Sequence, residues 1–323
     1  MSATLAVEVS GKWNETPEIC VLELRSIHKD QSLPAFRAGA HVEVYLPGQP
    51  QRQYSLCNAP GRTDFYHLGI FLEPESRGVS RALHQTVKVG DSFEISAPRN
   101  HFALVDGASH SLLFAGGIGV TPILAMAEEL ASRSANFSLH YCSRSKDRMA
   151  FRSRIEQSAW KQSARLYFDD GPDDQRLDVE RALLGPTKER HLYVCGPSGF
   201  VSWVKNTAAD LGWSDMNVHS ESFTGVAAEV EDGDRAFDVK IHETGQIIHV
   251  NKNQTVLNAL LDAGIDIPSS CEAGNCGTCQ TKVVSGTIDH RDQYLTSAER
   301  RENKSFMPCC SRTKDDMITI SLE

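Results

Sequence analysis

Three cysteines lie within nine residues in the last quarter of this 323-residue chain. They form the pattern C-x4-C-x2-C, and a fourth cysteine follows after 29 intervening residues. This spacing is typical of plant-type [2Fe–2S] sites, in which four thiolates converge on two irons. Gly274 and Gly277 lie inside the loop, where the missing side chains would let backbone amides point at the sulfur atoms. The predicted cluster ligands are Cys271, Cys276, Cys279 and Cys309.

A structural zinc site is the competing interpretation of these cysteines. Zinc sites usually draw on two C-x2-C pairs, whereas here three ligands are close together and one is distant. Cys310 is a competing fourth ligand, and Cys309 is preferred because the pair Ser311–Arg312 after it keeps the usual spacing. Apart from Cys195, the other cysteines are interpreted as buried free thiols. The total of nine cysteines needs no disulfide, which indicates a reducing cytoplasm.

Composition and charge exclude several classes of protein. With 40% hydrophobic and 23% charged residues, the chain has ordinary globular composition rather than that of a disordered segment. Its net charge of −9 and the absence of a dense basic stretch argue against a nucleic-acid partner. The N-terminal residues MSATLAVEVSGKW lack the features of a secretory signal. Residues 111–127 are uncharged, but they are short for a membrane span and contain glycines and a proline. We therefore expect no membrane partner.

The order of predicted strands and helices indicates three domains. Residues 1–105 contain short β-rich runs separated by turn signals, the pattern of a small antiparallel barrel. In residues 106–228, apolar strands ending in Gly or Ser alternate with helical segments, which predicts a parallel sheet with crossover helices. A small, acidic linker over 224–235 leads into residues 229–323, which hold the cysteine loop. The predicted fold is multidomain, with an antiparallel β-barrel followed by an α/β domain.

Two short motifs in the barrel are candidate flavin contacts. In RQYS, an arginine can bind a flavin phosphate, a tyrosine can lie against the isoalloxazine ring and a serine can approach its N5 atom. RGVS stands at the expected start of a short helix, whose backbone amides suit a phosphate. Taken alone, each motif equally fits a solvated strand or a turn. Their residues are Arg52, Gln53, Tyr54, Ser55, Arg77, Gly78, Val79 and Ser80.

Two turns in the α/β domain are candidate dinucleotide contacts. One apolar strand runs into GGIG and a helix that begins with Thr-Pro, so that a pyrophosphate could approach the backbone. Another strand ends in CGP before a helix, which brings both turns to the same edge of the sheet. Each could be an ordinary tight turn, but four such motifs in this order ahead of the cysteine loop point to a function. The residues of the two turns are Gly116, Gly117, Gly119, Thr121, Pro122, Cys195, Gly196 and Pro197.

Together these motifs resemble the phthalate dioxygenase reductase family over essentially the whole chain. The resemblance extends from PAFRAGAHVEVYLP through RQYSL, SRGVS, PRNHF, AGGIGVTP, CGP and ESF to CEAGNCGTC, DHRDQYL and CCSR. Within the family, the branch of vanillate O-demethylase and carnitine monooxygenase reductases is the most similar. The resemblance implies that residues 229–323 form a β-grasp ferredoxin domain. It also implies an NADH-dependent enzyme that passes electrons through FMN and [2Fe–2S] to a separate Rieske-type terminal oxygenase.

The resemblance further implies roles for individual residues. Motifs 52–55 and 77–80 would bind FMN, together with the backbone at Gly69, and the two glycine turns would face the nicotinamide nucleotide. Phe223 would cover the flavin ring. The residues nearest to the hydride transfer would be Ser55, Thr121, Cys195 and Phe223.

Several alternatives stay open at this point. Val79 stands where relatives often have glycine, and Gln53 replaces a frequent small polar residue, which weakens both flavin assignments. FMN is preferred to FAD from the domain order and the RGxS turn. NADH is preferred to NADPH, but Ser143 and Arg144 follow the second parallel strand, where an arginine could contact either the ribose or a 2′-phosphate. The alternative function is a self-contained NAD(P)H reductase for a haem protein, a ferric chelate or another carrier.

Overall fold

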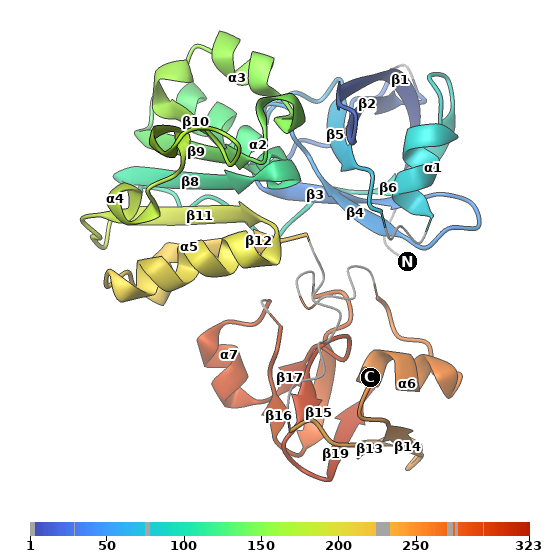
Figure 1. Cartoon of the computed structure of the whole chain (residues 1–323). Helices are drawn as coiled ribbons and strands as arrows, with labels where there is room; N and C mark the ends of the chain where they lie inside the picture. Colours follow the sequence, from blue (N-terminus) through green and yellow to red (C-terminus); the bar gives the residue numbers. More distant parts are fainter. Residues whose placement is uncertain are drawn as a thin grey trace. The chain divides into compact units, whose positions relative to one another are not determined.

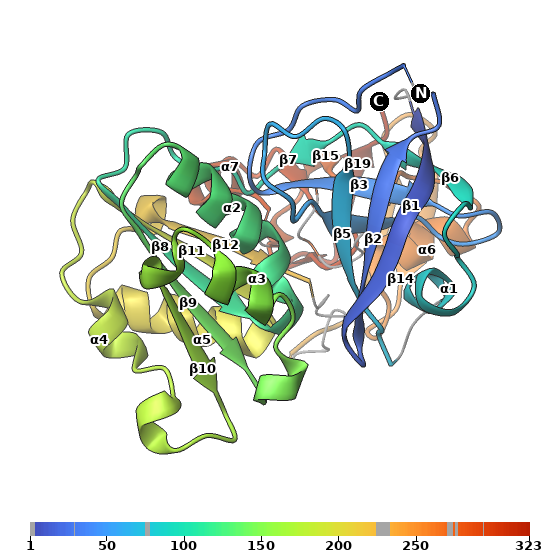
Figure 2. The same ribbon diagram turned by 90° about the horizontal axis from the view of Figure 1, so that it is seen from above.

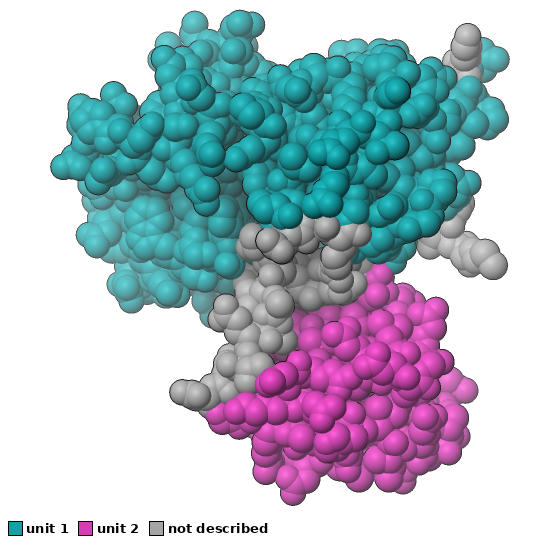
Figure 3. All heavy atoms as spheres, turned by 45° about the vertical axis from the view of Figure 1, so that its right-hand side comes forward, with its two compact units in different colours: residues 1–222 teal, residues 223–323 magenta. Residues whose placement is uncertain are grey.

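The chain forms two compact units, residues 1–222 and 223–323, which Figure 3 distinguishes by colour. The computed structural model describes residues 4–28, 30–74, 78–223, 233–269, 274, 277–292 and 294–323. The boundary predicted at 228/229 lies outside the described residues. The barrel and the α/β domain predicted from the sequence pack together as the first of the two units.

An antiparallel barrel occupies the first hundred residues, as predicted (Figure 1). Its strands are ordered β4-β3-β6-β1-β2-β5, with β7 paired to β3. A bridge between Leu56 and Leu68 joins the end of β4 to β5 and closes the sheet. The inside is filled by alternating apolar residues such as Val7 and Val9, which are completely buried. The elements are β1 (Thr4–Thr16), β2 (Ile19–Ser26), β3 (Ala40–Tyr45), β4 (Arg52–Ser55), β5 (Tyr66–Phe71), α1 (Val79–Gln85), β6 (Ser92–Ser96) and β7 (Arg99–Asn100).

A five-stranded parallel sheet follows, in the order β10-β9-β8-β11-β12. Helices α2 and α3 cover one face, and α4 and α5 cover the other (Figures 1 and 2). The strand order reverses between β8 and β11, so the chain leaves these two neighbouring strands toward opposite faces of the sheet. In such sheets, ligands bind in the crevice at this switch point. The elements are β8 (His110–Gly116), α2 (Val120–Ser132), β9 (Phe137–Ser143), α3 (Arg152–Gln157), β10 (Ala164–Phe168), α4 (Val179–Leu183), β11 (Arg190–Gly196), α5 (Ser198–Asp210) and β12 (Val218–Ser222).

Buried polar contacts attach the barrel to the α/β domain within the first unit. The carboxylate of Glu129 on α2 accepts a hydrogen bond of 2.7 Å from the backbone N–H of Ala38 and also pairs with Arg133. Arg154 on α3 donates to the carbonyl oxygen of Cys57 at 2.8 Å. In each contact, one group lies in a loop of the barrel and the other on a helix that covers the parallel sheet. The two contacts therefore fix the barrel and the α/β domain against each other.

The second unit is a β-grasp fold, again as predicted. Its sheet has the order β14-β13-β19-β15-β17, in which β13 and β19 run parallel, and α6 packs its apolar residues into the core. The Thr255 side chain caps α6 by accepting a hydrogen bond from the backbone N–H of Asn258. The elements are β13 (Phe237–Ile241), β14 (Ile247–Val250), α6 (Val256–Asp262), β15 (Thr281–Ser285), β16 (Ile288–Asp289), α7 (Ser297–Glu302), β17 (Ser305–Phe306), β18 (Arg312–Thr313) and β19 (Met317–Ser321). In the described parts of the chain, no helix is long and apolar enough to cross a membrane.

The contact of Glu129 with the barrel predicts a measurable loss of stability on substitution. Glu129→Met keeps the volume but leaves the buried Ala38 N–H without its acceptor, which should cost about 1–3 kcal/mol. Urea unfolding followed by tryptophan fluorescence measures the difference. Glu156→Met removes an exposed carboxylate that pairs with Arg152, and should cost less than about 1 kcal/mol. Equal losses in the two variants would contradict the buried role of Glu129.

Candidate functional sites

The two predicted glycine turns meet at the switch point of the parallel sheet. A Cβ atom added to Gly119 would lie 2.4 Å from the carbonyl carbon and oxygen of Cys195. A Cβ atom added to Gly196 would lie 3.0 Å from the Cα of Gly116. The backbones of the turns after β8 and β11 are therefore in direct contact, and only glycine fits at these positions. Backbone rather than side chains therefore meets at the switch point, where ligands bind in such sheets and where a pyrophosphate could approach the amides.

The residues around these turns have defined environments. Gly117 has a left-handed φ of +53°, and Pro122 lies in the first turn of α2, where it was predicted. Thr121 is buried, and its hydroxyl donates to the carbonyl oxygen of Ile118 at 3.0 Å, which holds the turn rather than leaving the hydroxyl free for a ligand. Pro197 is exposed and immediately precedes α5.

Cys195 is completely buried at the end of β11. Burial, reinforced by the nearby carboxyl of Glu221, raises the pKa of its thiol well above the ordinary value. The thiol is therefore protonated at neutral pH, and the site offers a small neutral group rather than a nucleophile.

Two residues near the turns were not predicted from the sequence. Phe200 on α5 packs against Gly116, since a Cβ atom added to Gly116 would lie 2.9 Å from the ring of Phe200. Glu221 pairs with Cys195 in the register of β11 and β12, and burial raises the pKa of its carboxyl to about 8. Its Oε2 has no hydrogen-bond partner among the described residues. The available signal for Glu221 was its place two residues before Phe223 in the ESF motif.

The predicted flavin motif RQYS forms β4, which pairs with β3. Ser55 is buried, and Gln53 donates to the carboxylate of Glu43 at 3.4 Å. Tyr54 packs against the barrel core, and burial raises the pKa of its phenol. Arg52 donates to the carbonyl oxygen of Gln51 at 2.8 Å. Because side chains alternate along a strand, Arg52 and Tyr54 lie on one side of β4 and Gln53 and Ser55 on the other.

The second predicted flavin motif leads into α1. Gly78 precedes the helix with a φ of +123°, and the side chain of Gln49 lies directly on it. Val79 turns into the barrel core, so only its backbone can face a ligand. Ser80 is buried and accepts a hydrogen bond of 3.4 Å from the backbone N–H of Glu73. Arg77 lies outside the described residues.

Other predicted contacts are placed as follows. Gly69 lies on β5, where an added Cβ would meet the methyl group of Thr121 at 2.6 Å, so this strand of the barrel touches the nucleotide turn. Ser143 is buried at the end of β9, and Arg144 is exposed beside it at the same edge of the parallel sheet. Phe223 is exposed and directly follows β12.

At the cysteine loop, the thiol of Cys309 interacts with the thiols of both Cys279 and Cys310. The backbone N–H of Gly274 donates to the Sγ of Cys309 at 3.2 Å. Cys310 also directs its thiol to the carbonyl oxygen of Met307. Gly274 has a φ of +73°, so the loop does require glycine there. An amide aimed at the Cys309 sulfur fits a thiolate ligand of an iron–sulfur cluster. Cys271 and Cys276 lie outside the described residues.

Comparisons with known proteins agree with this arrangement. Residues 239–314 match the 2Fe-2S iron-sulfur cluster binding domain, and residues 113–206 match the oxidoreductase NAD-binding domain. The vanillate O-demethylase oxidoreductase of a Pseudomonas species (strain HR199) is 48% identical over 94% of this chain and 95% of its own. The structure of phthalate dioxygenase reductase, described as modular for electron transfer from pyridine nucleotides to [2Fe–2S], is 31% identical with a TM-score of 0.74. That match covers 99% of this chain and 98% of the other.

A longer protein contains a similar arrangement. An intact type IV self-sufficient cytochrome P450 monooxygenase is 35% identical with a TM-score of 0.83. The match covers 98% of this chain but only 41% of the P450 chain.

A flavin barrel, a nucleotide-binding sheet and a 2Fe-2S domain define the class as a pyridine-nucleotide-dependent flavin iron–sulfur oxidoreductase with FMN and [2Fe–2S] as cofactors. The chain belongs to the phthalate dioxygenase reductase family. It is accordingly the reductase of a two-component oxygenase.

The contact between the two turns predicts the effect of a methyl group at Gly119. Gly119→Ala would force the turns apart and should lower kcat/KM for NADH about tenfold or more, equivalent to at least about 1.4 kcal/mol. Reduction of ferricyanide measures this without any protein partner. At Gly199, an added Cβ meets no described atom within 4 Å, so Gly199→Ala serves as the control and should retain activity. Full activity of the Gly119 variant would contradict the turn contact.

The environments of the adjacent cysteines predict different outcomes when each is replaced. Cys309→Ser should lose or strongly alter the visible absorption and EPR signals of a [2Fe–2S] cluster, because the Gly274 amide points at this sulfur. Cys310→Ser should keep both signals, because that thiol faces Met307. The reverse result would make Cys310 the fourth ligand.

Proposed function

We propose that this protein takes electrons from NADH and delivers them to a separate Rieske-type terminal oxygenase. The observation that carries the proposal is the packing of Gly69 on β5 against Thr121 at the start of α2. It brings the barrel, with its flavin motifs, to the nucleotide turn of the parallel sheet. A bound flavin and a bound nicotinamide can then meet inside one compact unit.

The proposal assigns residues 1–105 to FMN, 106–228 to the nucleotide and 229–323 to the cluster. FMN is held by motifs 52–55 and 77–80. The remaining proposed contacts with the nucleotide are Gly116, Gly117, Gly119, Pro122, Ser143, Gly196 and Pro197. The cluster ligands are Cys271, Cys276, Cys279 and Cys309.

Protein residues contribute placement and electrostatics in this scheme. When bound, FMN accepts a hydride from NADH and the [2Fe–2S] centre carries single electrons onward. Thr121 fixes the first turn through Ile118, so the glycine amides keep their orientation. Cys195 presents a small neutral thiol beside the nicotinamide position. Ser55 would hydrogen-bond near the N5 atom of a bound flavin, and Phe223 would cover the flavin ring.

NADH as donor and a cytoplasmic location form part of the same proposal. Arg144 is exposed directly after β9, where it can bind the ribose of NADH. If it instead bound a 2′-phosphate, the donor would be NADPH. Cys20, Cys57 and Cys195 are buried free thiols, which suits a reducing compartment.

The partner is best sought among demethylating oxygenases that act on methoxy-aromatic acids. Support comes from the match to vanillate O-demethylase oxidoreductase along almost the full length of both chains. A haem protein is the second candidate acceptor, because a P450 monooxygenase includes a region similar to 98% of this chain.

Reconstituted turnover tests the function. The purified protein is combined with a Rieske-type vanillate demethylase, or with a P450 haem domain as the alternative acceptor, and NADH and NADPH are compared as donors. We expect demethylation coupled to NADH oxidation, with NADPH at least about tenfold less effective, equivalent to about 1.4 kcal/mol. Reduction of the P450 but not of the Rieske oxygenase would favour the second acceptor. A colourless protein without flavin or [2Fe–2S] absorption would refute both.

A further inference from the structure

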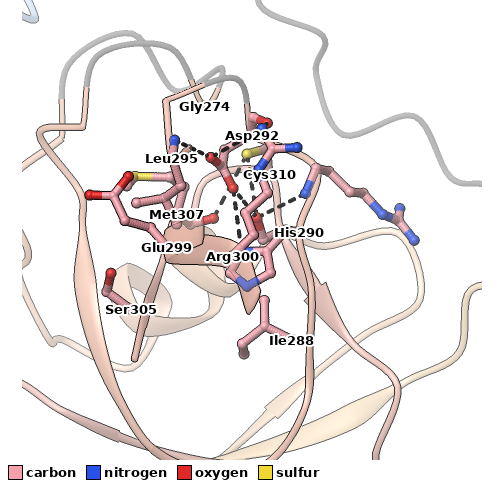
Figure 4. A network of polar contacts seen from close by, with 12 residues as sticks. Gly274, Ile288, His290, Asp292, Leu295, Glu299, Arg300, Ser305, Met307 and Cys310 are labelled. Carbon is pink, nitrogen blue, oxygen red and sulfur yellow. Dashed lines mark hydrogen bonds and ion pairs between the residues drawn. The ribbon is translucent and has the colours of Figure 1, made fainter. Parts of the chain in front are cut away.

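The side chain of Asp292 is fully buried beside the cysteine loop. It belongs to the DHRDQYL stretch, which the proposed electron path does not use. Its Oδ2 accepts a hydrogen bond of 2.8 Å from the backbone N–H of Leu295, and its Oδ1 accepts one of 3.4 Å from the hydroxyl of Ser311. Figure 4 shows Asp292 with Leu295 and Arg300 near Gly274. A buried carboxylate whose two oxygens both accept hydrogen bonds is held in one orientation.

Two positively charged or ionisable groups accompany this carboxylate. Arg300 on α7 lies 3.7 Å from Oδ2 and donates to the backbone carbonyl of Asp292. His290 places its Nδ1 3.5 Å from Oδ1. A capping box of Thr296 and Glu299 starts α7 and thereby orients the helix that carries Arg300. We call Asp292, His290, Leu295, Arg300 and Ser311 the Asp292 cluster.

The Asp292 cluster supports the loop at Gly274. A Cβ added to Gly274 would lie 2.8 Å from the Cα of Asp292 and 2.5 Å from the Sγ of Cys310. These two residues therefore form the surface on which Gly274 rests. From that position, the Gly274 N–H donates to the Sγ of Cys309.

The same cluster also fixes the far side of the cysteine loop. Ser311 accepts a hydrogen bond from the backbone N–H of Arg291 at 3.2 Å while its hydroxyl donates to Asp292. The segment 291–295 is thus tied to the residue that follows Cys309 and Cys310. Asp292 therefore contacts Gly274 through its Cα and Cβ atoms and the 309–311 turn through its carboxylate.

We propose that Asp292 is the positioning residue of the [2Fe–2S] site: it holds Gly274 so that its amide is directed at Cys309, and through Ser311 it holds the turn that carries Cys309. The inference rests on the proposed cluster ligands. A carboxylate suits this position because one oxygen accepts from a backbone N–H, the other accepts from a hydroxyl, and the negative charge lies beside Arg300. An asparagine would lose that charge, and its NH2 group would force the Ser311 hydroxyl to reorient so that it accepts rather than donates.

The test compares Asp292→Asn with Asp315→Asn in the full-length holoprotein. Asp315 also accepts a backbone amide in the same unit, from Thr287 at 2.6 Å, but lies outside the Asp292 cluster. We expect Asp292→Asn to change the EPR spectrum of the reduced cluster and to speed cluster loss to a chelator about tenfold or more. Asp315→Asn should match the unsubstituted protein in both measurements.

A second variant guards against simple misfolding. Ser311→Ala leaves the carboxylate but removes the donor at Oδ1 and the acceptor of the Arg291 N–H, so it should shift the EPR spectrum in the same sense with a smaller rise in cluster loss. Far-ultraviolet circular dichroism and FMN content report whether the fold is kept. If Asp292→Asn retains the EPR spectrum and the rate of cluster loss of the Asp315 variant, the inference is overturned. If the unsubstituted protein has no [2Fe–2S] spectrum, the proposed function fails instead.

Discussion

The close approach of two backbone turns is the constraint on which the rest of the first unit depends. The turns after β8 and β11 touch through Gly119 and the carbonyl of Cys195. Neighbouring parallel strands end at one edge, and their connections leave toward opposite faces at the switch point. Because glycines stand at the contact, backbone rather than side chains meets at this edge of the sheet. A nucleotide site of this kind tolerates changes in surrounding side chains but not an added methyl group at the contact.

The barrel is aligned with that crevice by packing. The methyl group of Thr121 occupies the space that a side chain at Gly69 would fill, and the carboxylate of Glu129 accepts a hydrogen bond from the backbone N–H of Ala38. Hydride transfer demands that two reacting rings meet within a few tenths of an ångström of their productive geometry. Buried contacts provide that precision because a close-packed interior resists displacement. The two parts of the first unit accordingly form one body rather than separate domains joined by a linker.

Much of this architecture follows from local sequence signals. The turn residues predicted the barrel, the strand–helix alternation predicted the parallel sheet, and Pro122 correctly indicated a helix start. Long-range packing escaped prediction. Nothing in the sequence near Phe200 shows that its ring rests on Gly116, and Val79 reads as part of a phosphate turn although its side chain fills the barrel core. These contacts depend on which residues, far apart in the sequence, pack together in the fold. The local sequence around each residue does not contain that information.

The choice between the adjacent thiols of Cys309 and Cys310 likewise depends on contacts that the local sequence does not show. The spacing favours Cys309 only through the residues that follow it, since either thiol satisfies the requirement for a distant fourth ligand. In the fold, the N–H groups of Cys310 and Ser311 donate to the carbonyl oxygen of Met307 and form a tight turn. The Sγ of Cys309 accepts from the Gly274 amide, while the Sγ of Cys310 lies against Gly274 itself. The proposed choice of Cys309 as ligand therefore rests on a turn and a buried carboxylate that the cysteine pattern does not include.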